Sequence, residues 1–310
     1  MHLVAITPEV LASVGIGTIV LGTLYALMAL GFTLIYSTVR ILNFAHGGFY
    51  MLGAMIVWYV SAAEAPAGYA GAYLLTPLNG PLWLGFALGI GAMFAAGVAV
   101  QRGINIRLMG RIRGWELNTL VVLFALAMII QSGTIVTLGP FTRDFSPIAQ
   151  GFLISGRLNI SYAELARFAI AIAVLLALQV FLKKSRHGLA TRAVAQDAEV
   201  ASVCSVKIAN IYLLVFGIGA ALAAIAGILL SNLIFIAPEG GWLPLIRAFI
   251  IVIFGGIGSV PGTIIAAFLL AAIEQYVALI IGFTWAFPVA FAVMILILII
   301  RPQGLFGLRE

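Results

Sequence analysis

Long apolar runs separated by short polar stretches occupy most of the chain. Most of these runs hold about 20 residues, the length that a helix needs to cross a bilayer core of about 30 Å. Because only helices and closed barrels satisfy all their backbone hydrogen bonds in hydrocarbon, the pattern predicts an all-α fold, a polytopic transmembrane helical bundle of about eight or nine spans. The predicted spans cover residues 10–36, 41–63, 81–101, 117–139, 164–182, 208–232, 245–257, 262–281 and 284–301.

Basic residues gather beside these runs and predict the orientation of the bundle. Lys and Arg in short loops favour the cytoplasmic side, so three basic clusters place the N-terminus outside and the C-terminus in the cytoplasm. The run 245–257 is short and could enter and leave on one side, but the last cluster would then lie outside, so the charge bias favours a short crossing. The clusters are Arg102, Arg107, Arg111 and Arg113; Lys183 to Arg192; and Arg301 with Arg309.

The composition supports a membrane-spanning bundle and excludes a soluble domain. The chain is 64% hydrophobic and 8% charged, with a mean hydropathy of +1.20. It is too apolar for a soluble domain, in which about a quarter of the residues are charged. We expect one transmembrane domain over residues 1–310, with a cytoplasmic loop at 183–207. The net charge of +6 then reports orientation and not nucleic-acid binding, and the single Cys204 cannot form an intrachain disulfide.

Polar residues at the start of the second run are candidates for the path of a transported solute. Asn43 and His46 open this run, Gly47 and Gly48 follow, and Tyr50 lies four residues after the histidine. A polar side chain in a membrane needs a partner or water, so these residues are expected to face the bundle interior or a water-filled path. The paired glycines could unwind the helix there. Alternatively, His46 pins a helix end through one hydrogen bond.

Glu274, with Gln275 beside it, is the second candidate. A lone carboxylate in an apolar run is costly unless it is paired, hydrated or protonated. Glu274 could pair with Arg247, face the path, or lie near the outer interface in headgroup water. Arg247 itself is expected to extend its charged end to the interface.

The segment from Lys183 to Lys207 is the longest one that could not lie in hydrocarbon, and it favours contact with another protein. Small residues recur there at helical spacing, so a helix would carry a small-residue face suited to close docking. A solvated loop on the membrane surface is the alternative. The chain has no nucleotide-binding loop, no nucleophile motif and no metal-ligand spacing. We therefore expect neither an enzyme nor a bound metal or cofactor.

Four motifs resemble those of the permease subunits of branched-chain (LIV-type) amino acid ABC importers, a family that also includes urea and amide permeases. They are NFAHGGFYMLGAM, HGLATRAVAQDAEVA, FGGIGSVPGTIIAA and the terminal RPQGLFG, in this order. The resemblance covers nearly the whole chain. It implies a multi-pass protein of the bacterial inner membrane that translocates branched-chain or other hydrophobic amino acids as one subunit of an importer.

The resemblance also implies partners and residue roles. The partners are a second permease subunit, two cytoplasmic ATP-binding cassette subunits that hold ATP and magnesium, and a periplasmic or extracellular substrate-binding protein. Arg192 to Cys204 would form a coupling helix seated in a cleft of an ATPase subunit, with contacts from Arg192, Ala195, Gln196, Asp197, Glu199 and Ala201. A glycine-rich turn would be formed by Gly255, Gly256, Gly258, Ser259 and Gly262.

Two departures and one rival interpretation accompany this resemblance. The family usually has an acidic residue where Gly48 stands, so a carboxylate that meets a substrate amine is not expected there. It commonly has Gly followed by Ile where Ser205 and Val206 stand. Both departures leave the architecture unchanged and weaken the identification of the substrate. The rival is a stand-alone secondary transporter or channel for a small polar solute that uses Glu274 or His46.

Overall fold

The computed structural model describes residues 7–62, 77–109, 114–155, 158–231, 233 and 236–306, so Arg111, Arg113 and Arg309 of the basic clusters lie outside the described residues. Within the described part, seven helices are long and apolar enough to cross a membrane. The prediction of an all-α polytopic bundle is confirmed. These helices are α1 (Pro8–Val39), α3 (Leu82–Val100, continuing through a π-helical turn at Gln101–Asn105 into α4, Ile106–Leu108), α5 (Trp115–Leu138), α6 (Tyr162–Lys184), α9 (Ile208–Ser231), α11 (Val260–Ile280) and α12 (Phe283–Ile300).

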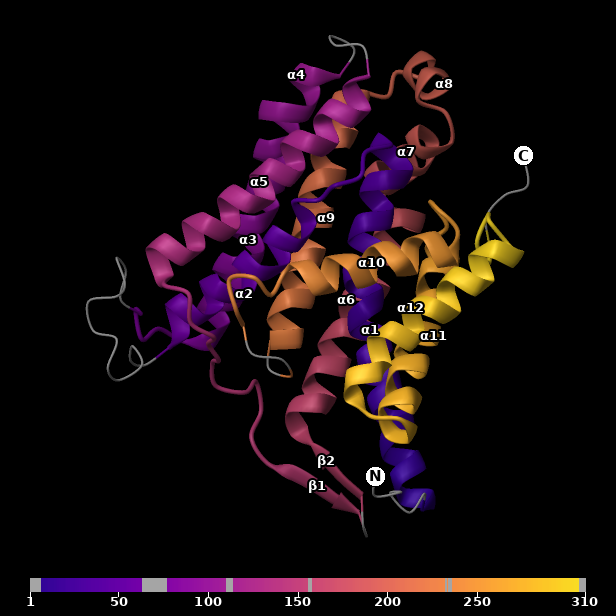
Figure 1. The fold of residues 1–310 in the computed structure, drawn as a ribbon. Helices are drawn as coiled ribbons and strands as arrows, with labels where there is room; N and C mark the ends of the chain where they lie inside the picture. The colour runs from indigo at the N-terminus through magenta and orange to yellow at the C-terminus, as the bar shows by residue number, and fades with distance from the viewer. Residues whose placement is uncertain are drawn as a thin grey trace.

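Two shorter helices, α2 (His46–Ser61) and α10 (Trp242–Gly255), occupy the places of the second and seventh predicted spans. Their 16 and 14 residues reach only about 24 and 21 Å at 1.5 Å per residue, less than the bilayer core. Each follows a non-helical stretch, residues 40–45 and 236–241 respectively. The prediction of helix from residue 41 is therefore wrong. Figure 1 shows that α10 lies across the long helices and not along them.

The core surrounds α1 and α9, which pack against each other and against most of the other helices. α1 also contacts α10 and α11, while α9 contacts α2 and α3. Glycines permit the close approach: a Cβ on Gly31 would lie 2.8 Å from the Gly219 carbonyl oxygen, and one on Gly97 would lie 2.5 Å from that of Phe216. Small residues let helices pack closely in a membrane, where van der Waals contact drives association. Gly91 is exposed and has no such neighbour within 4 Å.

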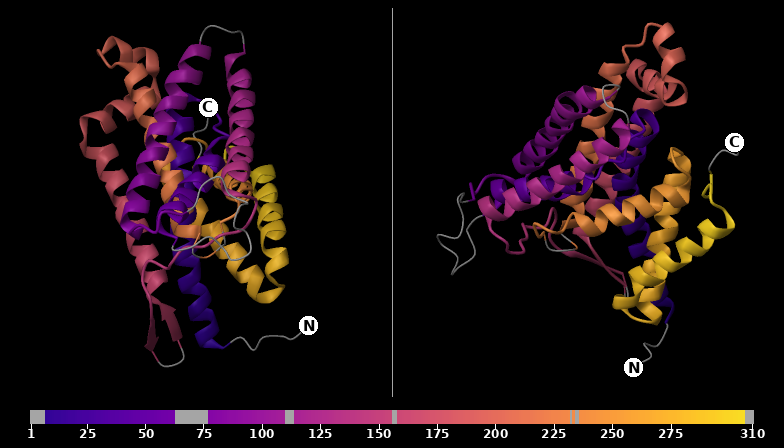
Figure 2. Two further views of the ribbon diagram at one scale, coloured as in Figure 1. Left: turned by 90° about the vertical axis from the view of Figure 1, so that its left-hand side faces the viewer. Right: turned by 45° about the horizontal axis from the view of Figure 1, so that its top comes forward.

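The two ends of the bundle carry different elements. At one end α1 begins, and near it lies an antiparallel hairpin of β1 (Phe152–Ser155) and β2 (Leu158–Ser161), which the apolar pattern did not predict. At the opposite end α7 (Arg186–Gln196) and α8 (Ala198–Val203) project from the bundle (Figure 1, Figure 2). The polar segment that could not lie in hydrocarbon is thus well separated from the start of α1.

Candidate functional site

The start of α2 has two faces with different surroundings. On one face, Asn43, His46 and Tyr50 are all buried inside the bundle. The His46 Nε2 lies 3.0 Å from the carbonyl oxygen of Met28 in α1, and the ring meets Phe32 edge-on, with 5.7 Å between the ring centres. This contact ties the first residue of α2 to α1. It is the pinned helix end that was one of the two expectations for His46.

The side chain of Asn43 is enclosed without a hydrogen bond to any described residue. Its side chain is fully buried, and neither its amide nitrogen nor its oxygen has a partner among the described residues. A buried amide without a hydrogen-bond partner costs free energy. A role for Asn43, His46 and Tyr50 in a solute path stays a prediction, since none of them lines the pocket on the other face.

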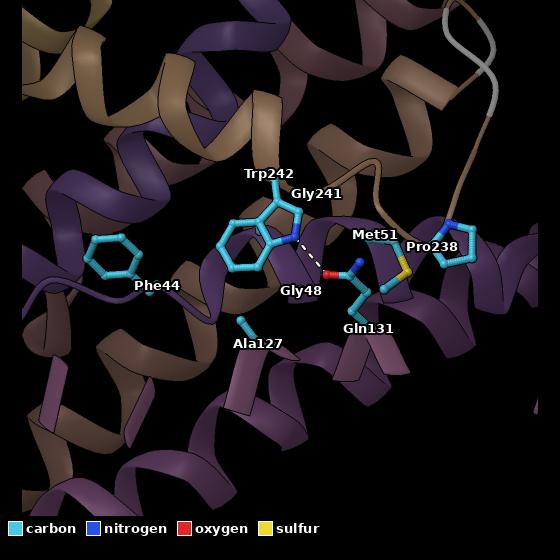
Figure 3. A pocket seen from close by; sticks show the side chains of 9 residues that line it. Phe44, Gly48, Met51, Ala127, Gln131, Pro238, Gly241 and Trp242 are labelled. Carbon is cyan, nitrogen blue, oxygen red and sulfur yellow. Dashed lines mark hydrogen bonds between the residues drawn. The ribbon is translucent and has the colours of Figure 1, made fainter. Parts of the chain in front are cut away.

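That pocket, here called the Gly48 pocket, lies between α2, α5 and the stretch that leads into α10 (Figure 3). Gly47, Gly48 and Met51 line it from α2, where their spacing of three and four residues places them on one face, and Phe44 lines it from the stretch before that helix. The free volume that these residues leave is about 10 Å³, roughly the room that one water molecule needs. The remaining lining residues are Ala127, Gln131, Pro238, Gly241 and Trp242.

The two glycines in this face make different contacts. A Cβ on Gly47 would lie 2.5 Å from the carbonyl oxygen of Gly241, whereas a Cβ on Gly48 would lie 3.2 Å from the end of the Ile130 side chain. Gly47 therefore lets the starts of α2 and α10 meet, and Gly48 lets the Ile130 side chain of α5 pack closely against α2. The prediction that these glycines unwind the helix is wrong. Both lie in the first turn of α2, and the break precedes His46.

One polar pair and an aromatic cluster close the pocket toward α5. The indole Nε1 of Trp242 donates a hydrogen bond to Oε1 of Gln131 at 2.7 Å (Figure 3). Phe124 of α5 packs against Phe44 and Trp242, with 6.0 and 5.4 Å between the ring centres. All nine lining residues are non-ionisable. The lining is therefore apolar apart from one amide.

Glu274 belongs to a separate group, here called the Glu274 cluster, with Arg247 and Tyr25. Its Oε1 lies 2.8 Å from Nε of Arg247, and the Tyr25 hydroxyl donates to its Oε2 at 2.6 Å. The expected pairing with Arg247 is confirmed. Glu274 and Arg247 are only 5% and 8% exposed, so headgroup exposure of the carboxylate and an interfacial position of the arginine are both wrong. Gln275 is half-buried against α1.

Residues 15–300 match the protein family described as a branched-chain amino acid transport system permease component. This chain belongs to that family. BraD of Pseudomonas aeruginosa, a high-affinity branched-chain amino acid transport system permease protein, is 31% identical over 295 residues, which cover 93% of each chain. LivH of Escherichia coli, with the same description, is 30% identical over 298 residues, or 94% of each chain. No solved structure gives a significant match.

The match confirms the resemblance seen in the four motifs. A probable LivH permease of Methanocaldococcus jannaschii is also similar, with 26% identity over 299 residues that cover 94% of this chain and 91% of the relative. The chain is therefore a permease component, and the relatives it matches are transport permease proteins. Its apolar helices make it a multi-pass protein of the bacterial inner membrane.

In this permease the stretch expected to form one coupling helix, Arg192 to Cys204, forms parts of two helices. Asp197 leaves helical backbone, with φ −154° and ψ 113°, between α7 and α8. Its Oδ1 accepts the backbone N–H groups of Glu199 and Val200 at 2.8 and 3.0 Å. Asp caps helix starts in this way because its short carboxylate satisfies N–H groups that have no partner in the helix. The prediction of one continuous helix is wrong.

The exposed surface of α7 and α8 also differs from the predicted small-residue face. Ala201, a small residue among the contacts that the resemblance implied, is buried, and the Ala195 carbonyl oxygen accepts a long hydrogen bond, 3.4 Å, from Nη2 of Arg40 at the end of α1. Val200 and Val203 are instead 60% and 85% exposed. The predicted contact residues that are exposed are Arg192, Gln196, Asp197 and Glu199.

The glycine-rich turn joins α10 to α11. Gly256 and Gly258 have φ values of 96° and 88°, in the left-handed region that glycine adopts without strain. Ser259 Oγ accepts the N–H of Gly262 at 3.2 Å and caps α11. A Cβ on Gly255 would lie 2.6 Å from the Gly262 carbonyl group. Each residue of the predicted turn therefore has a distinct conformational or packing reason for its identity.

The C-terminal motif packs onto this turn. The N–H groups of Leu305 and Phe306 donate to the carbonyl oxygens of Phe254 and Gly255 at 2.8 and 3.2 Å. Gly304 has a φ of 74°, and a Cβ there would lie 2.6 Å from the Ile253 carbonyl oxygen. Two motifs that are separate in sequence thus form one structural unit at the end of α10.

Sequence reasoning singled out Gly48 but missed two lining residues, Gln131 and Trp242. Gln131 is an amide well inside the apolar run 117–139, the same kind of signal that pointed to Asn43. Trp242 follows the Pro-Glu-Gly-Gly stretch at residues 238–241, which lies between the predicted spans 208–232 and 245–257. Only the fold brings these two residues to the glycine face of α2.

Proposed function

We propose that this permease is the membrane-spanning subunit of an ATP-binding cassette importer that translocates branched-chain or other hydrophobic amino acids. The supporting observation is the family match over residues 15–300, with relatives whose names specify branched-chain amino acid transport. A second permease subunit and an external substrate-binding protein would complete the importer.

The energy would come from two cytoplasmic ATPase subunits that hold ATP and magnesium, since the sequence contains no nucleotide-binding loop. The whole chain, 1–310, would act as one transmembrane domain, and the cytoplasmic loop 183–207 would be its contact with an ATPase subunit. This contact is supported by the projection of α7 and α8 from the bundle (Figure 2). It is also supported by Val200 and Val203, two apolar side chains exposed among charged ones.

A charge at Val203 tests this contact. Burying an unpaired carboxylate in a protein interface costs more than about 1.4 kcal/mol, so Val203→Asp should weaken binding of the ATPase subunit at least about tenfold. The measurement is co-purification of the subunits together with solute-stimulated ATP hydrolysis. Phe152→Asp is the matched control, because Phe152 is equally apolar, 65% exposed, and lies in the hairpin at the opposite end. Equal losses in both variants would contradict the assignment of the contact.

Transport itself is tested in proteoliposomes that contain the complete importer. We expect ATP-dependent uptake of leucine, isoleucine or valine, and no ATP hydrolysis by the purified permease alone. The rival function, a stand-alone transporter that uses Glu274 or His46, receives no support from their contacts, since Glu274 is ion-paired and His46 holds the Met28 carbonyl. Uptake by the permease alone under a proton gradient, without ATP, would establish that rival and overturn the proposal.

A further inference from the structure

We propose that Arg167 of α6 binds the phosphate group of a phospholipid. The ligand class is a glycerophospholipid whose phosphate oxygens accept hydrogen bonds from the guanidinium group and whose acyl chains lie along α6. The site is separate from the Gly48 pocket and from the Glu274 cluster. The inference goes beyond the proposed function, because it does not depend on which solute the permease carries.

The guanidinium group of Arg167 is the first step of the argument, because it has no partner in the part of the chain that the structure describes. The residue is only 4% exposed, yet it forms no hydrogen bond and no ion pair with the described residues. Its Nε is enclosed, whereas Nη1 and Nη2 reach the surface. A buried charge without a partner is costly, above all in a membrane. An anion that reaches Nη1 and Nη2 would remove much of this cost.

The nearest acidic residue along the helix, Glu164, is held by another contact. Its Oε2 accepts the backbone N–H of Ser161 at 3.3 Å, and the Ser161 hydroxyl oxygen accepts the N–H of Ala163 at 3.2 Å. This capping arrangement places the carboxylate at the start of α6, where the helix dipole favours negative charge. Glu164 attracts Arg167 from beyond ion-pair distance, so the hydrogen-bond donors of the guanidinium group stay available.

The depth of Arg167 in the membrane is the second step. Lys183 and Lys184 lie in the last turn of α6 and mark one membrane interface. At 1.5 Å per residue, Arg167 lies about 24 Å before Lys183, so its Cα lies about 6 Å inside the other edge of a core about 30 Å thick. Helical side chains lean toward the N-terminal end of their helix, which here is the direction of that edge. The guanidinium group is thus directed to the level of the lipid headgroups.

The surface beside Arg167 is the third step. Arg167 shares its buried stripe with Ala163 and Ala171, and among the long helices α6 packs mainly against α1. The guanidinium group therefore emerges beside the line where α6 meets α1. Leu165 and Leu176, 40% and 56% exposed, offer apolar surface to acyl chains. The fork of an arginine matches phosphate oxygens with two parallel hydrogen bonds, and phospholipids supply phosphate at this level.

Lipid retention is the first test, made by native mass spectrometry of the complete importer after its phospholipids are diluted with detergent. We expect one phospholipid per permease to remain on the wild type, and Arg167→Met to lower that occupancy at least about tenfold, because a hydrogen bond to a charged group is lost. Arg167→Lys should keep part of it. The matched control is Arg102→Met, since Arg102 is an exposed arginine near the end of another long helix, and it should retain lipid like the wild type.

Two outcomes of this test would overturn the proposal. The first is equal lipid retention by Arg167→Met and the wild type. The second is loss of the second permease subunit from the Arg167→Met importer together with unchanged lipid, because Arg167 would then pair with a protein group.

Stability with and without lipid is the second test, made by denaturant unfolding of the purified permease in detergent. Without phospholipid, Arg167→Met should unfold at a higher denaturant concentration than the wild type, because it removes an unpaired charge. Added phospholipid should raise the unfolding midpoint of the wild type and not of the variant, because it binds the folded site. Inorganic phosphate should give no such rise. An equal rise with inorganic phosphate, or no rise with phospholipid, would overturn the assignment of a lipid to this site.

Discussion

The Glu274 cluster and the Gly48 pocket both include residues of α10, yet their polar side chains differ in how completely they are hydrogen-bonded. In the cluster, both carboxylate oxygens of Glu274 are bonded, one to Arg247 and one to Tyr25. In the pocket, all lining residues are non-ionisable, and the Gln131 amide accepts one hydrogen bond while its Nε2 group has no acceptor among the described residues. The carboxylate of the Glu274 cluster is therefore fully paired, whereas the amide of the Gly48 pocket is only partly paired.

The cost of an unpaired charge in a membrane explains this difference. A carboxylate in hydrocarbon must be neutralised or paired, so the structure holds it with groups from α1 and α10. An amide is cheaper to leave half satisfied, because it carries no net charge. A conspicuous charge inside a span is thus a poor indicator of a solute path when a partner of opposite charge lies in another span.

Removal of the Glu274 carboxylate should have the largest effect on the free energy of unfolding. Glu274→Ala leaves Arg247 buried without its counter-ion, which costs about 3–5 kcal/mol of unfolding free energy. Joint replacement, Glu274→Leu with Arg247→Met, should recover most of that loss, because it removes both charges together. The measurement is denaturant unfolding in detergent micelles. A stable Glu274→Ala protein that has lost uptake would show that the cluster takes part in handling the solute.

Removal of the His46 ring should have the next largest effect. His46→Phe keeps a ring beside Phe32 but leaves the Met28 carbonyl oxygen without this partner, which costs about 1–3 kcal/mol. The same unfolding measurement gives the loss. An unchanged free energy of unfolding combined with lost uptake would contradict the role of His46 as a pin between α1 and α2.

Removal of the indole N–H should have a smaller effect on stability. Trp242→Phe keeps an aromatic ring and deletes the hydrogen bond to Gln131, for an expected loss of about 0.5–1.5 kcal/mol. The matched control is Trp285→Phe on α12, where the tryptophan is 56% exposed and little loss is expected. If the two variants lose the same stability, the hydrogen bond between Trp242 and Gln131 contributes nothing to stability. It would then not be what holds α5 against α10 at the pocket.

Replacement of Asn43 should have the smallest effect. Its side chain has no partner among the described residues, so Asn43→Leu, which is similar in size, should change the unfolding free energy by less than about 1 kcal/mol or raise it. Unfolding and leucine uptake are measured on the same preparation. Unchanged uptake would contradict a place for Asn43 on the solute path, and lost uptake with intact stability would support one.

The sequence predicted the class of this protein and most of its helices well. Long helices such as α1, α5 and α9 begin and end within a few residues of the predicted runs. Their hydropathy is a property of consecutive residues, and the bilayer imposes one length on all of them. The four motifs identified the family in the same local way, because each is a short run of residues.

The candidate site was predicted only in part. The stretch from Asn43 to Tyr50 was the right one, but its polar residues turned out to face the interior and its glycines to face the pocket. Helical spacing shows which residues share a face and not what that face meets. The break at Asp197 was missed for a related reason, because periodicity alone does not show whether an aspartate stays in a helix or caps the next one.

By itself, the sequence determined a polytopic α-helical permease of the inner membrane, since hydropathy and motifs act over short distances along the chain. Tertiary structure decided which polar groups have all their hydrogen-bond partners and which do not. Tyr25 and Glu274 are 249 residues apart yet share a hydrogen bond, and Trp242 reaches Gln131 across 111 residues. Such pairs depend on where the helices pack, and packing is set by the sum of many contacts that no single stretch of the chain contains.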